Sequence, residues 1–342
     1  WAASFDTLYI GGGTPSVLPE EDLEGLIADI RTAFTIATDA EITVEANPAD
    51  ITENLLASLR RSGVNRLNIG VQSFDDDSLA LLGRRHTALQ AIGAVQRVRD
   101  AGFVNIGLDL IYALPSSPAG GANGDMMPHR VPICSHLTTW LATLDTAIGM
   151  NPDHLSCYQL TLEEKTPLAK RCRLGEFILP DESRQADFFL RTAQILEENG
   201  YLHYEVSNFA RPGRESRHNR KYWNHVPYLG LGPAAHSFSG RERRWNRSSV
   251  DAYIGDLESG REPIESREIL SDEQLRLEAL FLGFRTRRGI CLETFRLRYG
   301  RDLLADKHMI ERLSEEGLVE VRDGFLRPTR AGMAVADSLA MI

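Results

Sequence analysis

Polar and acidic residues interrupt the apolar segments of this chain at positions that repeat from one segment to the next. The first interruption is Tyr9–Ser16, where Gly12, Gly13 and Thr14 follow an apolar run. Successive glycines expose backbone N–H and C=O groups, so a ligand can approach them closely. A glycine triplet also occurs in ordinary turns. Whether this one binds a ligand is therefore judged together with the other interruptions.

Those other interruptions are Glu45, Gln72 and Asp109, each within or at the end of a segment with alternating apolar residues. Burying a carboxylate is costly unless it is paired or bound to a ligand. Singly, each residue could equally be a helix cap or a turn acceptor. Together they predict a rim that binds a polar ligand with ribose-like hydroxyl groups and an amino-acid-like end.

A second cluster lies at Arg217–Trp223, which reads RHNRKYW. His218 could ligate a metal or a porphyrin iron through a ring nitrogen, while Tyr222 and Trp223 could offer flat faces to a macrocycle. On residue types alone, a loop anchored by buried aromatics with a hydrogen-bonded His218 is the favoured reading. Further along, His236 is expected to be a satisfied core histidine.

The composition and charge argue against several classes of protein. The chain has 342 residues and a formal net charge of −10, which argues against non-specific nucleic-acid binding. It contains no apolar run long enough for a membrane span and no recognisable signal peptide. Its cysteines match neither a metal knuckle nor a disulfide framework, so we expect a reducing, cytoplasmic location; they are Cys134, Cys157, Cys172 and Cys291.

Strand and helix patterns alternate along the first 210 residues, which predicts βαβ units and a parallel sheet curled into a barrel or partial barrel. The first expected strand ends at Ile10, and the others are 41–46, 66–72, 104–111, 154–162 and 203–208. The segment 116–134 has no periodicity and is expected to be a surface insertion.

The rest of the chain changes character, and we expect three regions: 1–210, 211–265 and 266–342. Residues 211–247 are expected to be mostly loop. A helix over 272–285 is followed by two helices, a hairpin with Asp323-Gly324 at its tip, and a last helix over 330–341. This order predicts a winged-helix-like α+β module, which in so acidic a chain is expected to be structural.

The chain resembles the HemW-type radical S-adenosylmethionine proteins, relatives of the oxygen-independent coproporphyrinogen III oxidases. The match runs from Leu8 to about Phe238, and more loosely to Leu339. The motifs that carry it are YIGGGTPS, VEANP, LNIGVQSF, LGRRHT, GLDLIYALP, YEVSNFARPG, RHNRKYW and GLGPAAHSF. The resemblance implies a partial (β/α)6 radical SAM barrel that holds a [4Fe–4S] cluster and S-adenosylmethionine, here lacking its first strand.

The resemblance also assigns contacts to S-adenosylmethionine. Gly12, Gly13 and Thr14 would contact its methionine end, and Glu45 would lie near the ribose. The remaining adenosyl and carboxylate contacts would come from Gln72, Arg84 and Asp109, with the adjacent Arg85 as an alternative to Arg84.

The family's CxxxCxxC cluster loop does not occur in this sequence, and none of the four cysteines replaces it, since a cluster needs several converging thiolates. We expect the coding sequence upstream of Trp1 to supply that loop and the first barrel strand, so that the cluster belongs to the full-length protein only. The alternative is a chain that has lost the cluster and acts only as a binding protein.

The RHNRKYW motif favours the branch described as haem chaperones, which bind haem and hand it to acceptor proteins. His218 would then supply an axial nitrogen, Tyr222 and Trp223 would cover a porphyrin face, and the propionates would pair with Arg214, Arg217, Arg220 or Lys221. The second reading is a radical oxidase that decarboxylates porphyrinogen propionates.

Overall fold

The computed structural model describes residues 4–115, 137–305 and 307–341. The chain divides into two compact units. Unit 1 comprises Trp1–His203 and Ser207–Ser216, and unit 2 comprises Tyr204–Val206 and Arg217–Ile342. The region 211–265, expected to be separate, is therefore shared between the two units, most of it in unit 2. The expected insertion at 116–134 lies outside the described residues.

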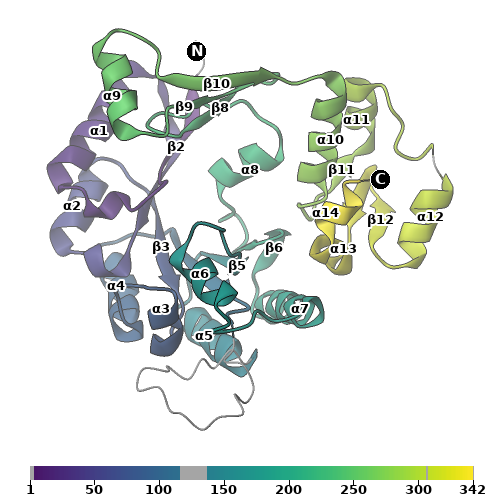
Figure 1. Cartoon of the computed structure of the whole chain (residues 1–342), viewed down its shortest axis with the longest axis horizontal. Coiled ribbons are helices and arrows are strands. Elements are labelled where there is room, and N and C mark those ends of the chain that lie inside the picture. The colour runs from purple at the N-terminus through teal and green to yellow at the C-terminus, as the bar shows by residue number, and fades with distance from the viewer. Residues whose placement is uncertain (1–3, 116–136, 306, 342) are drawn as a thin grey trace. The chain divides into compact units, whose positions relative to one another are not determined.

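Unit 1 is built on a seven-stranded sheet with the order β1-β2-β3-β4-β5-β7-β6 (Figure 1). Strands β1 to β5 pair in parallel, and β7 runs antiparallel to β5. This curled sheet confirms the predicted partial barrel. The strands are β1 (Phe5–Ile10), β2 (Ile36–Ala46), β3 (Arg66–Gln72), β4 (Ile106–Tyr112), β5 (His154–Gln159), β6 (Leu202–Glu205) and β7 (Asn208–Ala210).

Helices connect the parallel strands, and several begin where the sequence offers a capping side chain. Thr52 accepts from the N–H of Leu55, and Thr87 forms a capping box with Gln90, which satisfies N–H groups that a helix start leaves open. The helices are η1 (Pro15–Val17), α1 (Glu20–Ala33), η2 (Pro48–Asp50), α2 (Glu53–Arg61), α3 (Asp76–Leu81), α4 (Ala88–Asp100), α5 (Leu137–Gly149), α6 (Pro167–Arg173) and α7 (Glu182–Glu198).

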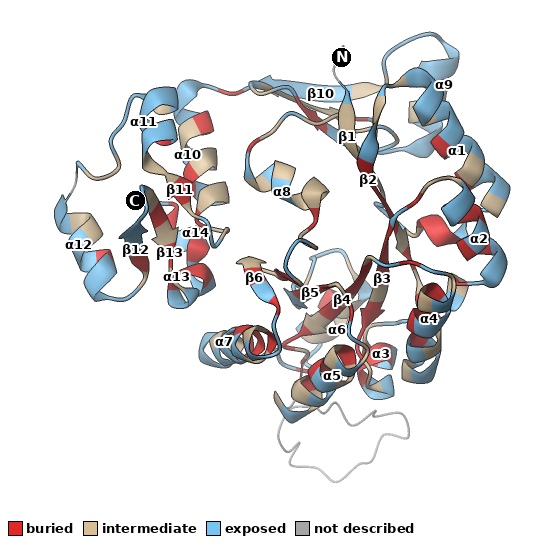
Figure 2. Ribbon diagram, turned by 180° about the vertical axis from the view of Figure 1, so that it is seen from behind, coloured by how far each residue is buried: buried red, intermediate tan, exposed pale blue. Residues whose placement is uncertain are grey.

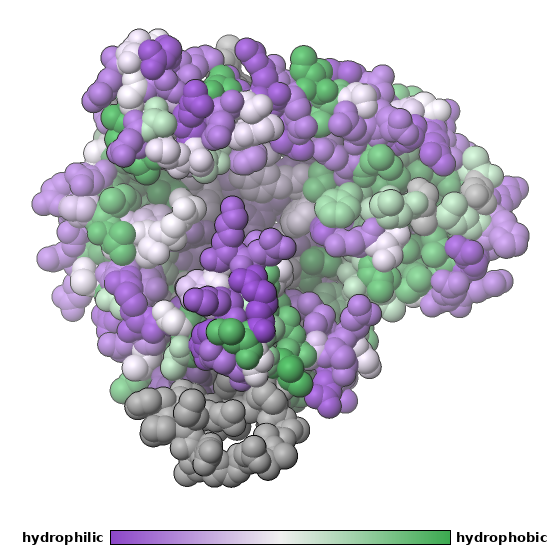
Figure 3. Space-filling view, in the orientation of Figure 1, coloured by the Kyte–Doolittle hydropathy of each residue, from purple (hydrophilic) through white to green (hydrophobic). Residues whose placement is uncertain are grey.

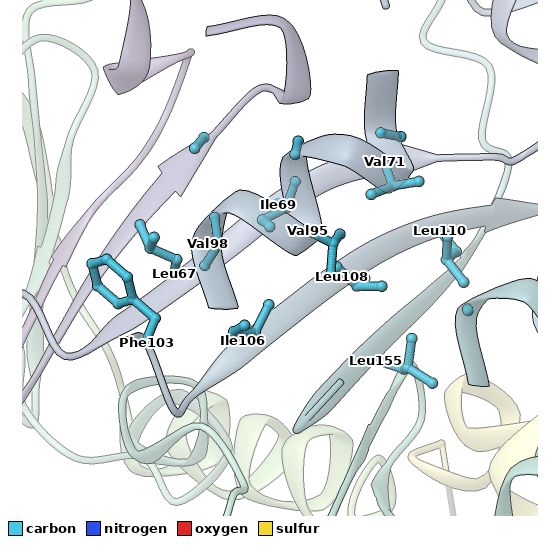
Figure 4. Close-up of a cluster of buried hydrophobic side chains, with 14 of the residues drawn as sticks. Leu67, Ile69, Val71, Val95, Val98, Phe103, Ile106, Leu108, Leu110 and Leu155 are labelled. Atoms are coloured by element: carbon cyan, nitrogen blue, oxygen red, sulfur yellow. The ribbon is translucent and has the colours of Figure 1, made fainter. Parts of the chain in front are cut away.

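The two faces of the sheet differ because side chains alternate along each strand. One face is apolar and covered by helices: Leu67 and Ile69 of β3 and Leu108 of β4 lie against Val95 and Val98 of α4 (Figure 4). Figure 2 shows the same division, with buried residues along β3 and β4 and on one side of α4. The opposite face, which we call the inner face, carries polar side chains such as those at 45, 68, 109 and 156.

One predicted strand differs from the structure. The expected strand 203–208 is interrupted by a turn at Val206-Ser207, and its second half becomes β7, which is antiparallel to β5. Ser and Asn favour turns because their side chains bond to nearby backbone groups. The apolar alternation across this segment hid the turn.

Unit 2 contains two three-stranded sheets, with the orders β10-β9-β8 and β11-β13-β12. The predicted sequence of two helices and a hairpin is confirmed, since α11 and α12 precede β12 and β13, with Asp323-Gly324 between those strands. Its elements are α8 (Arg217–Trp223), β8 (His236–Phe238), β9 (Glu242–Asn246), α9 (Val250–Glu258), β10 (Ile264–Ile269), α10 (Asp272–Gly283), β11 (Ile290–Cys291), α11 (Leu292–Tyr299), α12 (Lys307–Glu315), β12 (Val319–Arg322), β13 (Phe325–Pro328), α13 (Arg330–Ala334) and α14 (Ala336–Leu339).

The expectation that residues 211–247 are mostly loop was wrong, because they contain α8, β8 and β9. No residue of α8 is buried, so its sequence lacks the apolar stripe that reveals a helix.

The surface of unit 2 is partly apolar. Hydrophobic side chains are visible in Figure 3 over the C-terminal helices, and Leu277, Phe281 and Leu297 are among the exposed residues. Within the described residues, no helix combines the length and the apolar character needed to cross a bilayer.

Candidate functional site

Most of the predicted rim residues lie at the carboxyl ends of parallel strands, where barrels of this kind bind ligands. Gly12, Gly13 and Thr14 follow β1, and Gln72 ends β3. Glu45 is the next-to-last residue of β2, and Asp109 lies in the middle of β4. Arg84 lies in the turn after α3, where its N–H bonds to the carbonyl of Leu79.

Asp109 is the central group of the inner face. The residue as a whole is partly buried, and Asn68 Nδ2 donates to its Oδ2 at 2.6 Å. Its other oxygen, Oδ1, is buried and accepts no hydrogen bond from the described residues. Burial raises the pKa of Asp109 to about 6, although Ser156 and Asn68 both act to lower it. A buried acceptor without a donor is costly, so Oδ1 is suited to a ligand that donates a hydrogen bond or carries positive charge.

Gly107 makes the Asn68–Asp109 contact possible. It pairs with Asn68 across β3 and β4, and a Cβ at position 107 would lie only 2.3 Å from Asn68 Oδ1. The Asn68 side chain therefore occupies the space that any larger residue at 107 would need. This glycine allows the amide to reach Asp109.

Glu45 is oriented by Tyr9 on the adjacent strand. The phenol donates to Glu45 Oε1 at 2.5 Å, and burial, followed by the charge of Glu45, raises the pKa of Tyr9. The phenol therefore stays protonated and remains a donor. Glu45 Oε2 forms no hydrogen bond with the described residues, so it is available to hydroxyl or ammonium donors.

The two adjacent arginines after α3 have different surroundings. Arg85 donates to both oxygens of Asp50 at 3.1 Å. Arg84 forms no ion pair with the residues that the structure describes. Partial desolvation lowers the pKa of Arg84, and the charge of Asp109 raises it. The geometry therefore favours Arg84 over Arg85 as the guanidinium available to a ligand carboxylate.

Ser16 connects the glycine turn to the next loop. Its hydroxyl donates to Asp50 Oδ2 at 2.9 Å and accepts from the N–H of Asn47 at 3.0 Å. Sequence reasoning gave Ser16 no role, because its partners lie some thirty residues away in sequence. These contacts fix the loop after β1 against the loop after β2.

Gln72 adopts an unusual backbone conformation. Its φ is +68°, in the left-handed region that non-glycine residues seldom occupy, and its side chain is nearly buried. The parallel pairing of β3 with β4 shifts register between Ile69 and Gln72. Such local strain is typical of functional sites, and here it sets the direction of the amide at the rim.

The rim is open at its glycines. Gly12 has a φ of +85°, and a Cβ at Gly12 or Gly13 would meet no atom within 4 Å. Exposed backbone groups, an available guanidinium at Arg84 and the orphaned oxygen of Asp109 provide the donors and acceptors that an amino-acid-like ligand with hydroxyl groups requires. These residues fit S-adenosylmethionine.

The described residues do not fit an iron–sulfur cluster. They contain no group of three or more His, Cys, Asp or Glu side chains able to hold a metal ion. Of the described cysteines, Cys157 is buried and burial raises the pKa of its thiol, while Cys172 and Cys291 lie in different units. No step of chemistry is therefore derived through a cluster.

Deeper on the inner face, sequence reasoning also missed Arg66 and His154. Arg66 is 2% exposed and donates to Asn105 Oδ1 at 2.9 Å and to the carbonyl of Arg214 at 3.2 Å. Burial, followed by the charge of Arg66, lowers the pKa of His154 well below its usual value, so this ring is neutral. The available signal was the alternation of polar residues within β3 and β5.

The second predicted site lies on helix α8 of unit 2. His218 Nε2 lies 2.9 Å from the hydroxyl of Tyr222, and the two rings meet edge to face. Tyr222 also contacts Tyr228 with ring centroids 4.7 Å apart, and burial raises the pKa of Tyr222 to about 12. His218 and Tyr222 share one face of the helix because they are four residues apart.

Trp223 is one residue further along α8, about 100° around the helix from Tyr222. Its indole Nε1 is buried and has no hydrogen-bond partner among the described residues. Of the cations proposed for propionates, Arg214 belongs to unit 1, where it pairs with Asp153 at 3.7 Å. Arg217, Arg220 and Lys221 lie on α8 itself.

The expectation that His236 is a core histidine was wrong. The residue is exposed and stacks on Trp245 with ring centroids 5.8 Å apart. It pairs with Trp245 between β8 and β9, and the alternation of these short strands turns it away from the buried Ser237 side.

Two regions of the chain match known sequence families. A profile of the Radical SAM superfamily matches residues 2–118, and a profile of the HemN C-terminal domain matches residues 270–335. The fold is that of the coproporphyrinogen III oxidase HemN from Escherichia coli, with a TM-score of 0.78 over 99% of this chain and 77% of that one, at 22% identity. The first profile assigns this part of the chain, residues 2–118, to the Radical SAM superfamily.

Individual relatives narrow the family. The chain is 38% identical to "Heme chaperone HemW" of Lactococcus lactis, covering 84% of this chain and 71% of that protein. It is 34% identical to the protein of the same name from Bacillus subtilis, covering 97% and 84%. It is 32% identical to the bovine "Radical S-adenosyl methionine domain-containing protein 1, mitochondrial", covering 98% and 75%. The chain belongs to the HemW-type radical S-adenosylmethionine proteins.

We expect Gly107→Ala to destabilise unit 1. The new Cβ would displace the Asn68 amide from Asp109, and overpacking of this kind costs about 1–3 kcal/mol. Urea unfolding of the chain measures the change. Gly25→Ala in α1 is the matched control, since nothing lies within 4 Å of its Cβ and alanine in a helix interior stabilises by about 0.5–1 kcal/mol. Equal unfolding free energies for the two variants would contradict the packing argument.

Proposed function

We propose that this protein binds S-adenosylmethionine at the rim of unit 1, binds haem at α8 of unit 2, and delivers haem to an acceptor protein. The observation that carries the first part is the buried Asp109 Oδ1, which has no hydrogen-bond donor among the described residues. The second and third parts rest on membership of a family whose relatives are named heme chaperones and on the His218–Tyr222 pair.

At the rim, the backbone of Gly12, Gly13 and Thr14 would bind the methionine end of S-adenosylmethionine. The guanidinium of Arg84 would pair with its carboxylate. The oxygens of Asp109 and Glu45 would accept from ammonium and hydroxyl groups, and the amide of Gln72 would complete the adenosyl contacts. The residues described here would bind and orient S-adenosylmethionine.

At α8, His218 would bind the haem iron through Nε2, which requires that iron replace the Tyr222 hydroxyl now bonded there. Tyr222 and Trp223 would cover parts of the macrocycle, and the cations of α8 would pair with propionates. We favour a haem-binding chaperone over an oxidase, because the likeness to coproporphyrinogen III oxidase, at 22% identity, is a likeness of fold alone.

The proposed compartment is the cytosol. The described cysteines are free thiols, as in proteins of reducing compartments. A haem-accepting protein is the proposed partner.

We expect Asp109→Ala to weaken S-adenosylmethionine binding about ten- to a hundred-fold, because a hydrogen bond to a charged partner contributes about 1.5–3 kcal/mol. Calorimetry with S-adenosylmethionine on the purified protein measures the affinity. Asp145→Ala, which removes an exposed carboxylate of α5, should leave it unchanged. If Asp109→Ala binds S-adenosylmethionine as tightly as this control, Asp109 has only a structural role.

We expect His218→Ala to weaken haem binding and to shift the Soret band, while S-adenosylmethionine binding survives. His236→Ala, which removes an exposed histidine of the same unit, is the matched control and should alter neither. Haem titration followed by absorption spectroscopy gives both readouts. If His218→Ala has the spectrum and affinity of the unmodified protein, haem binds elsewhere.

A further inference from the structure

Helix α8 needs support from outside itself. It has seven residues and none of them is buried. Isolated helices shorter than about 12 residues are marginal in water. Contacts from the rest of unit 2 must therefore hold α8, and with it the His218–Tyr222 pair, in place.

The strongest of these contacts is made by His225, two residues after the end of α8. Its φ of +56° turns the chain back sharply, and its N–H closes onto the carbonyl of Tyr222 at 3.0 Å. The ring is almost buried and stacks on Phe238 of β8, with centroids 4.7 Å apart and an interplanar angle of 7°. Nε2 lies 3.0 Å from Glu278 Oε2 on α10.

Glu278 is held in turn by Arg243 of β9. The guanidinium donates from Nη1 to Oε1 at 2.9 Å and from Nη2 to Oε2 at 2.8 Å. The side chains of Arg243 and Glu278 are 28% and 26% exposed, so this two-pronged pair is better shielded than an ordinary surface ion pair. We call His225, Glu278 and Arg243 the α8 clamp. It joins the end of α8 to α10 and to β9.

The direction of the pKa shift of His225 is consistent with the hydrogen bonds of the clamp. Burial lowers the pKa of His225, and Arg298 and Arg243 act in the same direction, while Glu278 opposes them. A neutral imidazole donates from only one nitrogen, and here the Glu278 carboxylate faces Nε2. The ring is thereby fixed in one orientation, with Nδ1 buried and without a partner among the described residues.

We propose that the α8 clamp is a positioning element for haem, which holds α8 so that His218 and Tyr222 are presented together. This inference rests on the proposed haem function of α8. The clamp does not touch the iron; it sets the fraction of molecules in which α8 is formed. Apparent affinity falls in proportion to that fraction, so loosening the clamp weakens haem binding without removing a haem ligand.

The test compares Glu278→Ala with Asp256→Ala. Asp256 likewise bridges two arginines of unit 2, Arg247 at 3.1 Å and Arg261 at 2.8 Å, but among the described residues its side chain has no hydrogen bond or ion pair with α8 or His225. Glu278→Ala removes the contacts with Arg243 and His225, and Asp256→Ala removes those with Arg247 and Arg261. Both variants therefore lose a carboxylate that has two basic partners, and only the first belongs to the clamp. Haem affinity, the Soret position of ferric haem and the melting temperature are measured for each on the full chain.

We expect Glu278→Ala to bind haem about ten- to a hundred-fold more weakly, since it removes several charged hydrogen bonds. Its spectrum should show a mixture of histidine-ligated and unligated iron, which added imidazole converts to a single ligated form. Glu278→Gln keeps an acceptor oxygen for His225 and should lose less. Asp256→Ala should retain the affinity and spectrum of the unmodified protein.

Equal haem affinities and spectra for Glu278→Ala and Asp256→Ala would contradict the proposed role of the clamp, provided that His218→Ala still abolishes the Soret band of histidine-ligated iron. Should Glu278→Ala fail to fold, Glu278→Gln decides, because unchanged haem binding in that variant contradicts the proposal. A failure of the haem function itself is distinguishable, since His218→Ala would then leave haem binding intact whatever the clamp variants do.

Discussion

The hydrogen bond from Asn68 to the buried carboxylate of Asp109 is the interaction on which the site in unit 1 depends. It exists because Gly107 leaves room for the amide and because β3 and β4 pair in parallel with Asn68 opposite Gly107. It satisfies one carboxylate oxygen and leaves the other buried without a donor among the described residues. The partial barrel thus holds an acceptor to which a ligand can donate.

In both units the residues of the proposed site lie outside the apolar core, although the two folds differ. In unit 1 the apolar face of the sheet packs against helices and stabilises the fold. The polar residues lie on the inner face, where they leave that core intact. In unit 2 no residue of helix α8 is buried, and His225, two residues beyond its end, contacts Glu278. Sites placed outside the apolar core in this way are sensitive to single hydrogen bonds, since few other contacts hold them.

Much of unit 1 was predictable from sequence, because strands that alternate with helices have strong apolar periodicity. Glu45, Gln72 and Asp109 stood out as polar interruptions of such strands. Their partners did not: Asn68 and Tyr9 act across neighbouring strands, and strand register is set by packing that no local pattern reveals. Helix α8 was missed for a related reason, since tertiary contacts rather than an apolar stripe stabilise it. The break between β6 and β7 was hidden by continuous alternation.

The central claim is that ionised Asp109 binds a positively charged ligand at the rim. Its pKa is raised to about 6, so the carboxylate is ionised above that pH and protonated below it. Calorimetry of S-adenosylmethionine binding between about pH 5 and 8 tests this in the unmodified protein and in Asp109→Asn. The account predicts an affinity that is nearly constant above about pH 7, about halved near pH 6, and falls by up to about tenfold per unit below it, with no such fall in Asp109→Asn. The same pH dependence in both proteins, or none in either, would contradict it.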